Sequence, residues 1–194
     1  NLSITSKINI NWLKRFTDRL YLLQKKHNFY LIGGDISKSK ELSLSGTFFG
    51  QAKLKNILFQ NRCFLDDDIW VTGNLGNSYI GFKILTNSKL KINKKKIDTF
   101  INQYLYPKPC MFGYVASKYI SAAIDISDGF YGDLNKILNS NFGAIIKLQN
   151  IPISNNLRSV ILENNSKKNI NEILSWGDDY QLIFTSKKKF RNKI

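Results

Sequence analysis

The sequence predicts a mixed α/β protein in which short apolar strands end in glycine-containing or acidic turns and alternate with amphipathic helices. Three stretches carry this prediction: residues 29–35, 122–130 and 176–185 each join an apolar run to a turn with one or two aspartates. With 194 residues, 43% of them hydrophobic, the chain is long enough for one sizeable core or two small ones.

Helices and strands follow from apolar periodicity along the chain. Residues 11–27 carry apolar side chains at roughly the i, i+3, i+4, i+7 spacing of an amphipathic helix, with Trp12, Phe16 and Leu20 among them. Further helices are expected at 78–85, 97–105, 112–120 and 130–138, and two more between Ser154 and Ser175. Strands are expected at 29–32, 42–47, 69–73, 122–126, 143–148 and 181–185.

A domain boundary is expected near residue 52, because the chain after Gly50 is basic and irregular until about Leu65. The predicted domains are therefore 1–52 and 53–194. The charge run from Lys89 to Lys96 is interpreted as an exposed connector, and the triple aspartate at 66–68 as a solvated turn.

The net charge of +15 first suggests a polyanionic partner, yet only five of the 29 basic residues are arginines. Lysine, asparagine and isoleucine are abundant together, as a coding sequence rich in A and T would produce. Lysines and aromatics are also not interleaved on one segment, so nucleic-acid binding is the poorest fit. Cys63 and Cys110 lie far apart without metal-ligand spacing, which favours a reduced, cytoplasmic setting, and no apolar run is long enough to span a membrane.

The stretch Ile124-Asp125-Ile126-Ser127-Asp128-Gly129 places two carboxylates three residues apart at a strand-to-helix turn. Two nearby carboxylates repel, so they favour a proton, a basic partner or a shared cation, and hard oxygen ligands suit Mg²⁺. The N–H groups of a helix starting near Asp128 would favour phosphate at the same place. Ser127 and Asp128 are equally typical helix N-caps, so both interpretations stay open.

Two further acidic turns also lie beside predicted strands. Gly33-Gly34-Asp35 follows the strand at 29–32 and is open to interpretation as a plain loop or a ligand loop, and Asp178-Asp179 precedes the last strand. Three carboxylate turns without histidine or cysteine chemistry favour work on a Mg²⁺-bound nucleotide, and the chain has no P-loop motif.

Five motifs in order resemble the thiamine-monophosphate kinase family, which belongs to the superfamily of aminoimidazole-ribonucleotide synthetase. The motifs are Leu-Ile-Gly-Gly-Asp (31–35), Asp-Ile-Trp-Val-Thr-Gly-Asn-Leu-Gly-Asn-Ser (68–78), Pro-Lys-Pro (107–109), Ile-Asp-Ile-Ser-Asp-Gly (124–129) and Gly-Asp-Asp-Tyr-Gln-Leu-Ile-Phe-Thr (177–185).

The resemblance implies a two-domain α/β fold, incomplete at both ends, with 1–52 as the C-terminal half of the ATP-binding and dimerisation domain and 53–194 as most of the C-terminal domain. It also implies a homodimer that transfers the γ-phosphoryl group of ATP to thiamine monophosphate, with neither a nucleic acid nor a membrane as partner. By resemblance, the ATP contacts are Gly34, Asp35 and Ser127, the magnesium ligands are Asp35, Asp125 and Asp128, and the substrate contact is Asp178.

Several positions depart from the family pattern: Gln60 stands where the family has an ATP-contacting arginine, and Asn77, Cys110 and Trp176 replace usual Asp, Arg and Gly residues. By the same resemblance, the parts of the family fold that would precede Asn1 and follow Ile194 are expected to be missing from this sequence. Two alternatives stay open: another ATP-dependent enzyme of the superfamily that activates an oxyanion or carbonyl oxygen, and an inactive truncated remnant.

Overall fold

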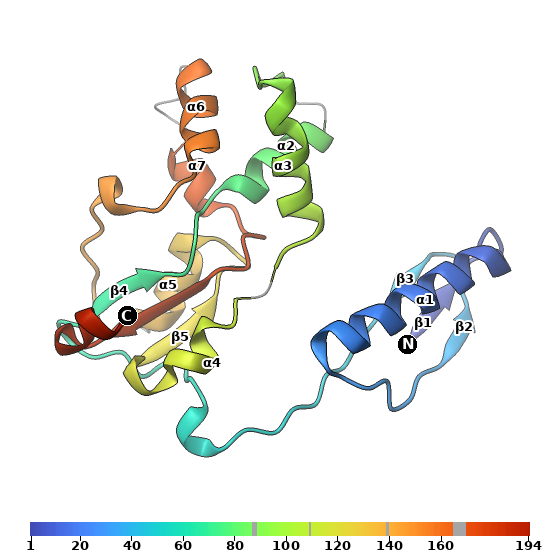
Figure 1. The fold of residues 1–194 in the computed structure, drawn as a ribbon, viewed down its shortest axis with the longest axis horizontal. Helices are drawn as coiled ribbons and strands as arrows, with labels where there is room; N and C mark the ends of the chain where they lie inside the picture. The colour runs from blue at the N-terminus through green and yellow to red at the C-terminus, as the bar shows by residue number, and fades with distance from the viewer. Residues whose placement is uncertain (87–88, 109, 139, 165–169) are drawn as a thin grey trace. The chain divides into compact units, whose positions relative to one another are not determined.

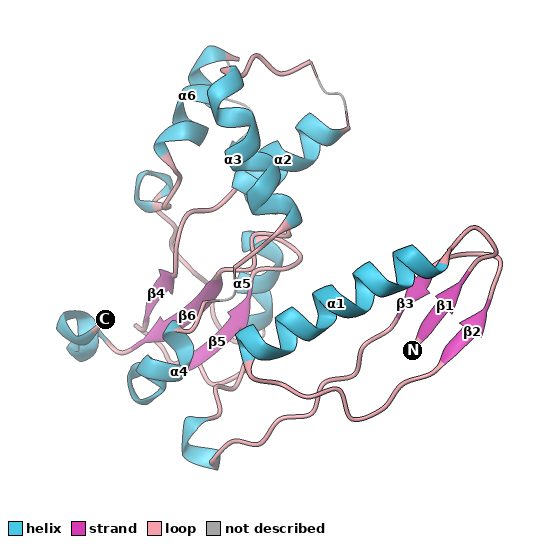
Figure 2. Cartoon of the chain, turned by 45° about the vertical axis from the view of Figure 1, so that its right-hand side comes forward, coloured by secondary structure: helices cyan, strands magenta, loops and turns pink. Residues whose placement is uncertain are grey.

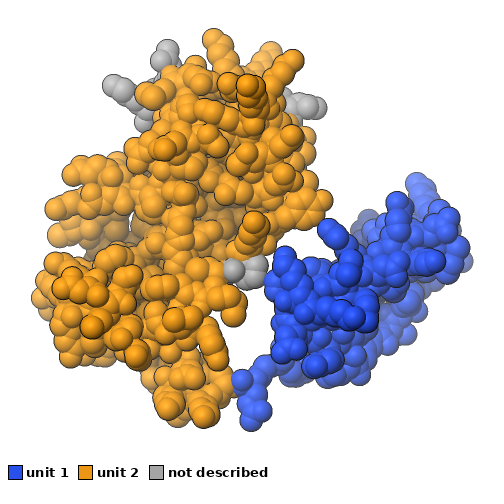
Figure 3. All heavy atoms as spheres, viewed as in Figure 1, with its two compact units in different colours: residues 1–51 blue, residues 52–194 orange. Residues whose placement is uncertain are grey.

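The structure is a computed structural model, and it describes residues 1–86, 89–108, 110–138, 140–164 and 170–194. The chain divides into two compact units, Asn1–Gln51 and Ala52–Ile194 (Figure 3). Each unit has its own three-stranded sheet, so each is described by itself (Figures 1 and 2). The functional assignment of the predicted domains, 1–52 and 53–194, stays a prediction.

Unit 1 is a small sheet with one long helix. Its elements are β1 (Leu2–Ile4), α1 (Ile10–His27), β2 (Ile36–Lys38) and β3 (Ser43–Leu44). The central strand β1 pairs in parallel with β2 and antiparallel with β3. The Asn9 side chain caps α1 by accepting a hydrogen bond from the Trp12 N–H at 2.9 Å, and Asn28 ends the helix in the left-handed conformation. The helix predicted at 11–27 is confirmed.

The strand predicted at 29–32 is wrong, because these residues lie in a loop where Tyr30 is 80% and Ile32 84% exposed. The strand begins after the Gly-Gly-Asp turn instead, where Ile36 is opposite Leu2. Asp35 therefore precedes β2, and its carbonyl oxygen accepts a hydrogen bond from the Leu2 N–H at 2.9 Å. The pairing partner lies more than 30 residues away, so a local pattern could not indicate which residues would pair.

Unit 2 holds a second sheet and most of the helices. Its strands and α-helices are β4 (Asp68–Val71), α2 (Asn77–Leu85), α3 (Lys94–Leu105), α4 (Phe112–Ala116), β5 (Ala122–Asp125), α5 (Phe130–Leu138), α6 (Asn155–Glu163), α7 (Ile170–Ser175) and β6 (Leu182–Ser186). The helices expected at 78–85, 97–105 and 130–138, the two expected between residues 154 and 175, and the strands expected at 69–73, 122–126 and 181–185 are confirmed within a few residues.

The sheet of unit 2 has the order β4-β6-β5, and both pairings are antiparallel. Ile183 of β6 and Ala122 of β5 are buried with the apolar face of α5, which includes Phe130, Leu134 and Ile137. The fully buried Phe184 packs against the rings of Trp70 and Phe112. The helix α5 is thus fixed against the sheet immediately after the acidic turn that follows β5.

Four helices form a second hydrophobic cluster in unit 2, and Figure 1 shows α2, α3, α6 and α7 together above the sheet. The helices α2 and α3 pack so closely at Gly81 that a Cβ atom there would lie 2.4 Å from the Phe100 carbonyl oxygen. Phe100 and Leu157 are fully buried in this cluster. None of the helices in the described part of the chain combines the length and apolar character that a membrane crossing needs.

Two predictions in unit 2 differ from the structure. Residues 143–147 form no strand, and Ile145 is 91% exposed. The apolar run in that segment has no strand partner among the described residues, so the predicted strand at 143–148 is wrong. The helix predicted at 112–120 is shorter, because α4 ends at Ala116 and a 3₁₀ turn follows. Pro109 of the Pro-Lys-Pro motif lies outside the described residues.

Candidate active site

Three segments meet at one end of the β4-β6-β5 sheet: the loop after β4, the turn after β5 and the turn before β6. Because β5 and β6 are antiparallel, the turn after β5 lies beside the turn before β6. Their backbones are joined by hydrogen bonds from the Ile126 N–H to the Gln181 carbonyl (2.8 Å), from the Tyr180 N–H to the Ile126 carbonyl (2.9 Å) and from the Asp178 N–H to the Ser127 carbonyl (3.1 Å). The acidic turn at 125–128 and Asp178, predicted separately, therefore belong to one structural site.

Two glycines allow this close approach. A Cβ atom on Gly177 would lie 1.7 Å from the Ser127 carbonyl oxygen, which is shorter than any non-bonded contact. Gly129 has a φ of +117°, and a Cβ atom there would lie 2.5 Å from the Ser175 carbonyl oxygen. Glycine at these positions is thus a geometric requirement of the site.

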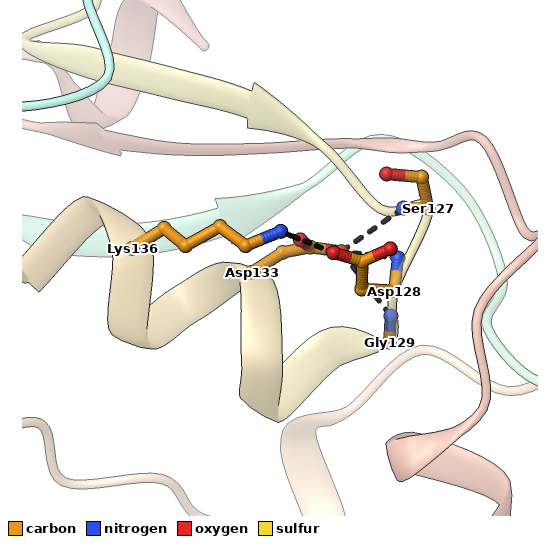
Figure 4. A network of polar contacts seen from close by, with 5 residues as sticks. All are labelled: Ser127, Asp128, Gly129, Asp133 and Lys136. Carbon is orange, nitrogen blue, oxygen red and sulfur yellow. Dashed lines mark hydrogen bonds and ion pairs between the residues drawn. The ribbon is translucent and has the colours of Figure 1, made fainter.

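Asp133 organises the acidic turn from the first part of α5 (Figure 4). Its side chain is fully buried, and Oδ2 accepts hydrogen bonds from the backbone N–H groups of Ser127 (3.0 Å), Asp128 (3.0 Å) and Gly129 (3.2 Å). These three donors are therefore already satisfied within the protein. They are not the donors of a helix start, because α5 begins at Phe130 rather than near Asp128. Phosphate binding at the first turn of α5 stays a prediction.

The other interpretation, that Ser127 or Asp128 is the N-cap of this helix, is wrong, because α5 begins at Phe130 and the residue before it is Gly129. Among the described hydrogen bonds, neither side chain bonds the backbone of α5, and Figure 4 shows that Ser127 reaches Asp133 through its backbone nitrogen. Sequence reasoning missed Asp133. Its signal was an acidic residue among the apolar positions Phe130, Leu134 and Ile137 of the same helix.

Lys136 links the buried and the exposed carboxylates of the turn. Its Nζ donates to Asp133 Oδ1 at 2.7 Å and to Asp128 Oδ2 at 2.5 Å. The hydrogen bonds to Asp128 and then to Asp133 raise the pKa of the Lys136 ammonium above its ordinary value, so this cation stays charged. Sequence reasoning missed this lysine because a helical lysine three residues after an aspartate is common on solvated surfaces.

Asp125 and Asp128, predicted as metal ligands, are both exposed at this turn. Within the described residues no group of three or more histidine, cysteine, aspartate or glutamate side chains converges on one point. Mg²⁺ is commonly bound by one or two carboxylates together with substrate phosphates, and it keeps several water molecules. Two exposed, hard oxygen donors on one turn fit that mode of binding.

The two neighbouring aspartates in the turn before β6, Asp178 and Asp179, have different roles. Asp179 Oδ2 accepts a hydrogen bond from the Gly76 N–H at 2.7 Å, and Oδ1 accepts one from Ser78 Oγ at 2.7 Å. Burial raises the pKa of Asp179 even though these hydrogen bonds oppose the shift. Asp179 thus caps α2, and Asp178 takes no part in this cap.

Asp178 and Tyr180 are not glycines, yet both have positive φ values in the left-handed region, 64° and 48°. Such conformations are unfavourable and are enriched at functional sites. The turn lines a pocket of about 620 Å³ with residues of the β4–α2 loop, of α3 and of the segment that follows α3, among them Asn74, Gln103 and Lys108. Asp178, the predicted substrate contact, therefore lines a polar pocket of ligand size.

A second pocket of about 870 Å³ borders β4 near Asp68 and Arg191, and none of the predicted site residues lines it. Gly34 and Asp35 lie in unit 1 with open space around Gly34, and their predicted meeting with Asp125 and Asp128 stays a prediction. Two unusual positions have structural partners: Asn77 accepts a hydrogen bond from Ser154 Oγ at 2.7 Å, and the Trp176 ring stacks on Phe82.

Comparison with known proteins supports the resemblance found in the motifs. No family model matches the chain. The thiamine-monophosphate kinase of Buchnera aphidicola subsp. Schizaphis graminum is 40% identical over the whole chain, which covers 59% of that protein. The chain thus spans about three-fifths of the length of the curated relatives it matches.

Solved structures of such proteins share the fold. The crystal structure of thiamine-monophosphate kinase from Stenotrophomonas maltophilia K279a is 27% identical with a TM-score of 0.82, over 99% of this chain and 62% of that one. The structure of AaThiL complexed with AMPPCP and TMP is 24% identical with a TM-score of 0.77, over 97% of this chain and 60% of that one. The predicted aminoimidazole-ribonucleotide synthetase-like α/β fold is therefore confirmed.

Proposed function

From its homology to bacterial thiamine-monophosphate kinases along its whole length, we propose that this chain is part of an enzyme that phosphorylates thiamine monophosphate. The reaction transfers the γ-phosphoryl group of ATP to the phosphate of thiamine monophosphate and gives thiamine diphosphate. The observation that carries this proposal is the hydrogen-bonded union of the 125–128 turn with Asp178 beside a polar pocket. A related protein, AaThiL, has been solved as a complex with AMPPCP and TMP.

In this proposal Asp125 and Asp128 would hold Mg²⁺, which supplies neutralisation of phosphate charge when bound. Ser127 lies between them in the sequence, and its contact with Asp133 uses the backbone nitrogen rather than the hydroxyl (Figure 4). Asp178 would contact the substrate from the facing turn. The acceptor phosphate oxygen is already anionic, so the chain needs to supply alignment rather than a strong general base.

The remaining roles belong to unit 1 and to the whole protein. Residues 1–52 would be part of the ATP-binding and dimerisation domain, with Gly34 and Asp35 as nucleotide contacts and Asp35 as a further magnesium ligand. Large apolar side chains of unit 1, including Ile32, Phe48 and Phe49, are more than three-quarters exposed, which supports a homodimer that covers them. We place the enzyme in the cytoplasm because the described cysteines, Cys63 and Cys110, are free.

The decisive experiment measures thiamine diphosphate formed from thiamine monophosphate and Mg-ATP, with the protein that contains this chain. Product that depends on both substrates is expected. ATP turnover that is indifferent to thiamine monophosphate would instead support another enzyme of the superfamily. A folded protein that neither binds nor turns over ATP would overturn the kinase proposal and support an inactive remnant.

A further inference from the structure

We propose that Lys136 is a positioning residue that occupies Asp128 as an internal counter-ion and leaves it when a metal–nucleotide complex binds. The inference rests on the proposed function, because it takes Asp125 and Asp128 as ligands of a divalent cation. It starts from one geometric fact, the simultaneous contact of the Lys136 ammonium with Asp133 and Asp128 (Figure 4).

The two carboxylates that share Lys136 differ in how firmly they hold it. The Asp133 side chain is fully buried, and its second oxygen is fixed by three backbone N–H groups of the turn. The Asp128 side chain is 67% exposed, and ion pairs in solvent contribute little to stability. Asp133 is thus the fixed anchor of the ammonium, and the contact with Asp128 is the exchangeable one.

The Lys136 ammonium beside Asp128 has opposite consequences for the binding of a free divalent ion and of a metal–nucleotide complex. A free divalent ion at Asp128 would meet the positive charge of Lys136 within a few Å, and this repulsion weakens its binding. A metal–nucleotide complex brings phosphate oxygens of its own, which can accept the hydrogen bonds that the ammonium withdraws from Asp128. The ammonium has three donors on a flexible stem, so it can reach them while it stays bonded to Asp133.

Lys136 therefore discriminates against the free ion and in favour of the ion that arrives with a nucleotide. Without any ligand, the positive charge of Lys136 compensates the negative charges of Asp128 and Asp133. Removal of its charge should then raise the affinity for the free ion and lower the affinity for the metal–nucleotide complex. A general loss of folding would lower both affinities.

The test measures Mn²⁺ binding to the 194-residue chain by the electron paramagnetic resonance signal of free Mn²⁺, with Mn²⁺ alone and with Mn²⁺–AMPPCP. Lys136→Met removes the charge, and Lys136→Gln removes it while it keeps a hydrogen-bond donor for Asp133. Lys136→Arg keeps the charge. Lys188→Met is the matched control, because Lys188 pairs with the exposed Asp66 in the same unit at 3.6 Å.

We expect Lys136→Met and Lys136→Gln each to bind Mn²⁺ alone at least about threefold more tightly and Mn²⁺–AMPPCP at least about threefold more weakly than the wild type. Lys136→Arg and Lys188→Met should stay close to the wild type for both ligands. Shifts in the same direction for both ligands, or equal shifts in Lys188→Met, would overturn the inference.

This outcome is separable from the fate of the proposed function, since no step of the assay requires thiamine monophosphate. Opposite shifts in a protein that makes no thiamine diphosphate would uphold the role of Lys136 and reject the substrate. Conversely, Mn²⁺ binding that Asp128→Asn leaves unchanged would reject the role of Lys136, even if the kinase reaction were observed.

Discussion

The Asp179 carboxylate accepts a hydrogen bond at 2.7 Å from the backbone N–H of Gly76, so a residue just before β6 caps a helix 103 positions earlier in the chain. Ser78 adds a second hydrogen bond to the same carboxylate from the first turn of α2. This contact joins the loop that follows β4 to the turn that carries Asp178. It therefore fixes two walls of the polar pocket relative to each other.

The first prediction concerns the stability of this junction. Asp179→Ala should lower the free energy of unfolding by about 2 kcal/mol, because it leaves the Gly76 and Ser78 donors without their acceptor. Asp179→Asn should lose less, since its amide oxygen can still accept from Gly76. Urea unfolding measures both, with Asp178→Asn as the neighbouring control. Equal stabilities of Asp179→Ala and the control would contradict the capping role.

The second prediction tests the close approach of the two turns. Gly177→Ala should destabilise unit 2 by about 3 kcal/mol, because a Cβ atom would collide with the Ser127 carbonyl and push the turns apart. Gly143→Ala is the matched control, because the Gly143 position has open space within 4 Å. Thermal unfolding of the two variants compares them directly. A Gly177→Ala protein as stable as Gly143→Ala would show that the turns can separate freely.

Local patterns were sufficient for the centre of unit 2. The small and apolar residues of 122–126, the glycine at 129 and the apolar stripe of 130–138 indicate strand, turn and helix within 17 residues, and the structure has them there. The placement of Asp125, Ser127 and Asp128 on one turn followed from this. Their proximity to Asp178 also depends on β6 pairing with β5, which no local pattern in the sequence indicates.

The failures involve contacts between residues distant in sequence. Residues 29–32 have a strand-like pattern, but the pairing of β1 with β2 selects Ile36–Lys38 instead. The apolar run of 143–148 does not become a strand, because an apolar run by itself supplies no pairing partner. Asp179 resembles an ordinary surface aspartate in the sequence, and the position of Asp133 among apolar helix residues does not say what it binds. Their anchoring roles depend on backbone donors that converge only after the chain has folded.

The third prediction separates the anchor of the acidic turn from its exposed carboxylate. Asp133→Ala should destabilise the protein by about 3 kcal/mol, because three backbone donors lose a buried charged acceptor. Asp128→Ala should change stability by less than about 1 kcal/mol, since its carboxylate is mostly exposed. Chemical denaturation of both proteins provides the comparison. A larger loss in Asp128→Ala than in Asp133→Ala would reverse our assignment of the two roles.

The fourth prediction concerns pH. Hydrogen bonds from Arg191 lower the pKa of Asp68 below its ordinary value of 3.8. An aspartate with a lowered folded pKa stabilises the protein above its unfolded pKa, and this contribution disappears as the pH falls through the folded pKa. The stability difference between the wild type and Asp68→Asn should therefore shrink as the pH is lowered from about 6 to about 3. A difference that grows on acidification would refute the ion pair as its cause.

The last prediction addresses metal and nucleotide binding at the turn. Asp125→Asn and Asp128→Asn should each weaken Mg-ATP affinity or lower turnover at least about tenfold, equivalent to about 1.4 kcal/mol, because each removes a charged oxygen ligand. Both side chains are exposed, so stability should change little, and calorimetric titration with Mg-AMPPCP can then be read without a folding correction.

Asp98→Asn is the control for this last prediction, because Asp98 is an exposed aspartate on α3 of the same unit. Its removal changes the net charge of the chain by the same amount as either turn variant. An equal loss of affinity in Asp98→Asn would attribute the effect to general charge, which is already strongly positive in this chain. Wild-type affinity and turnover in both turn variants would leave the carboxylates at 125 and 128 with no part in holding the nucleotide.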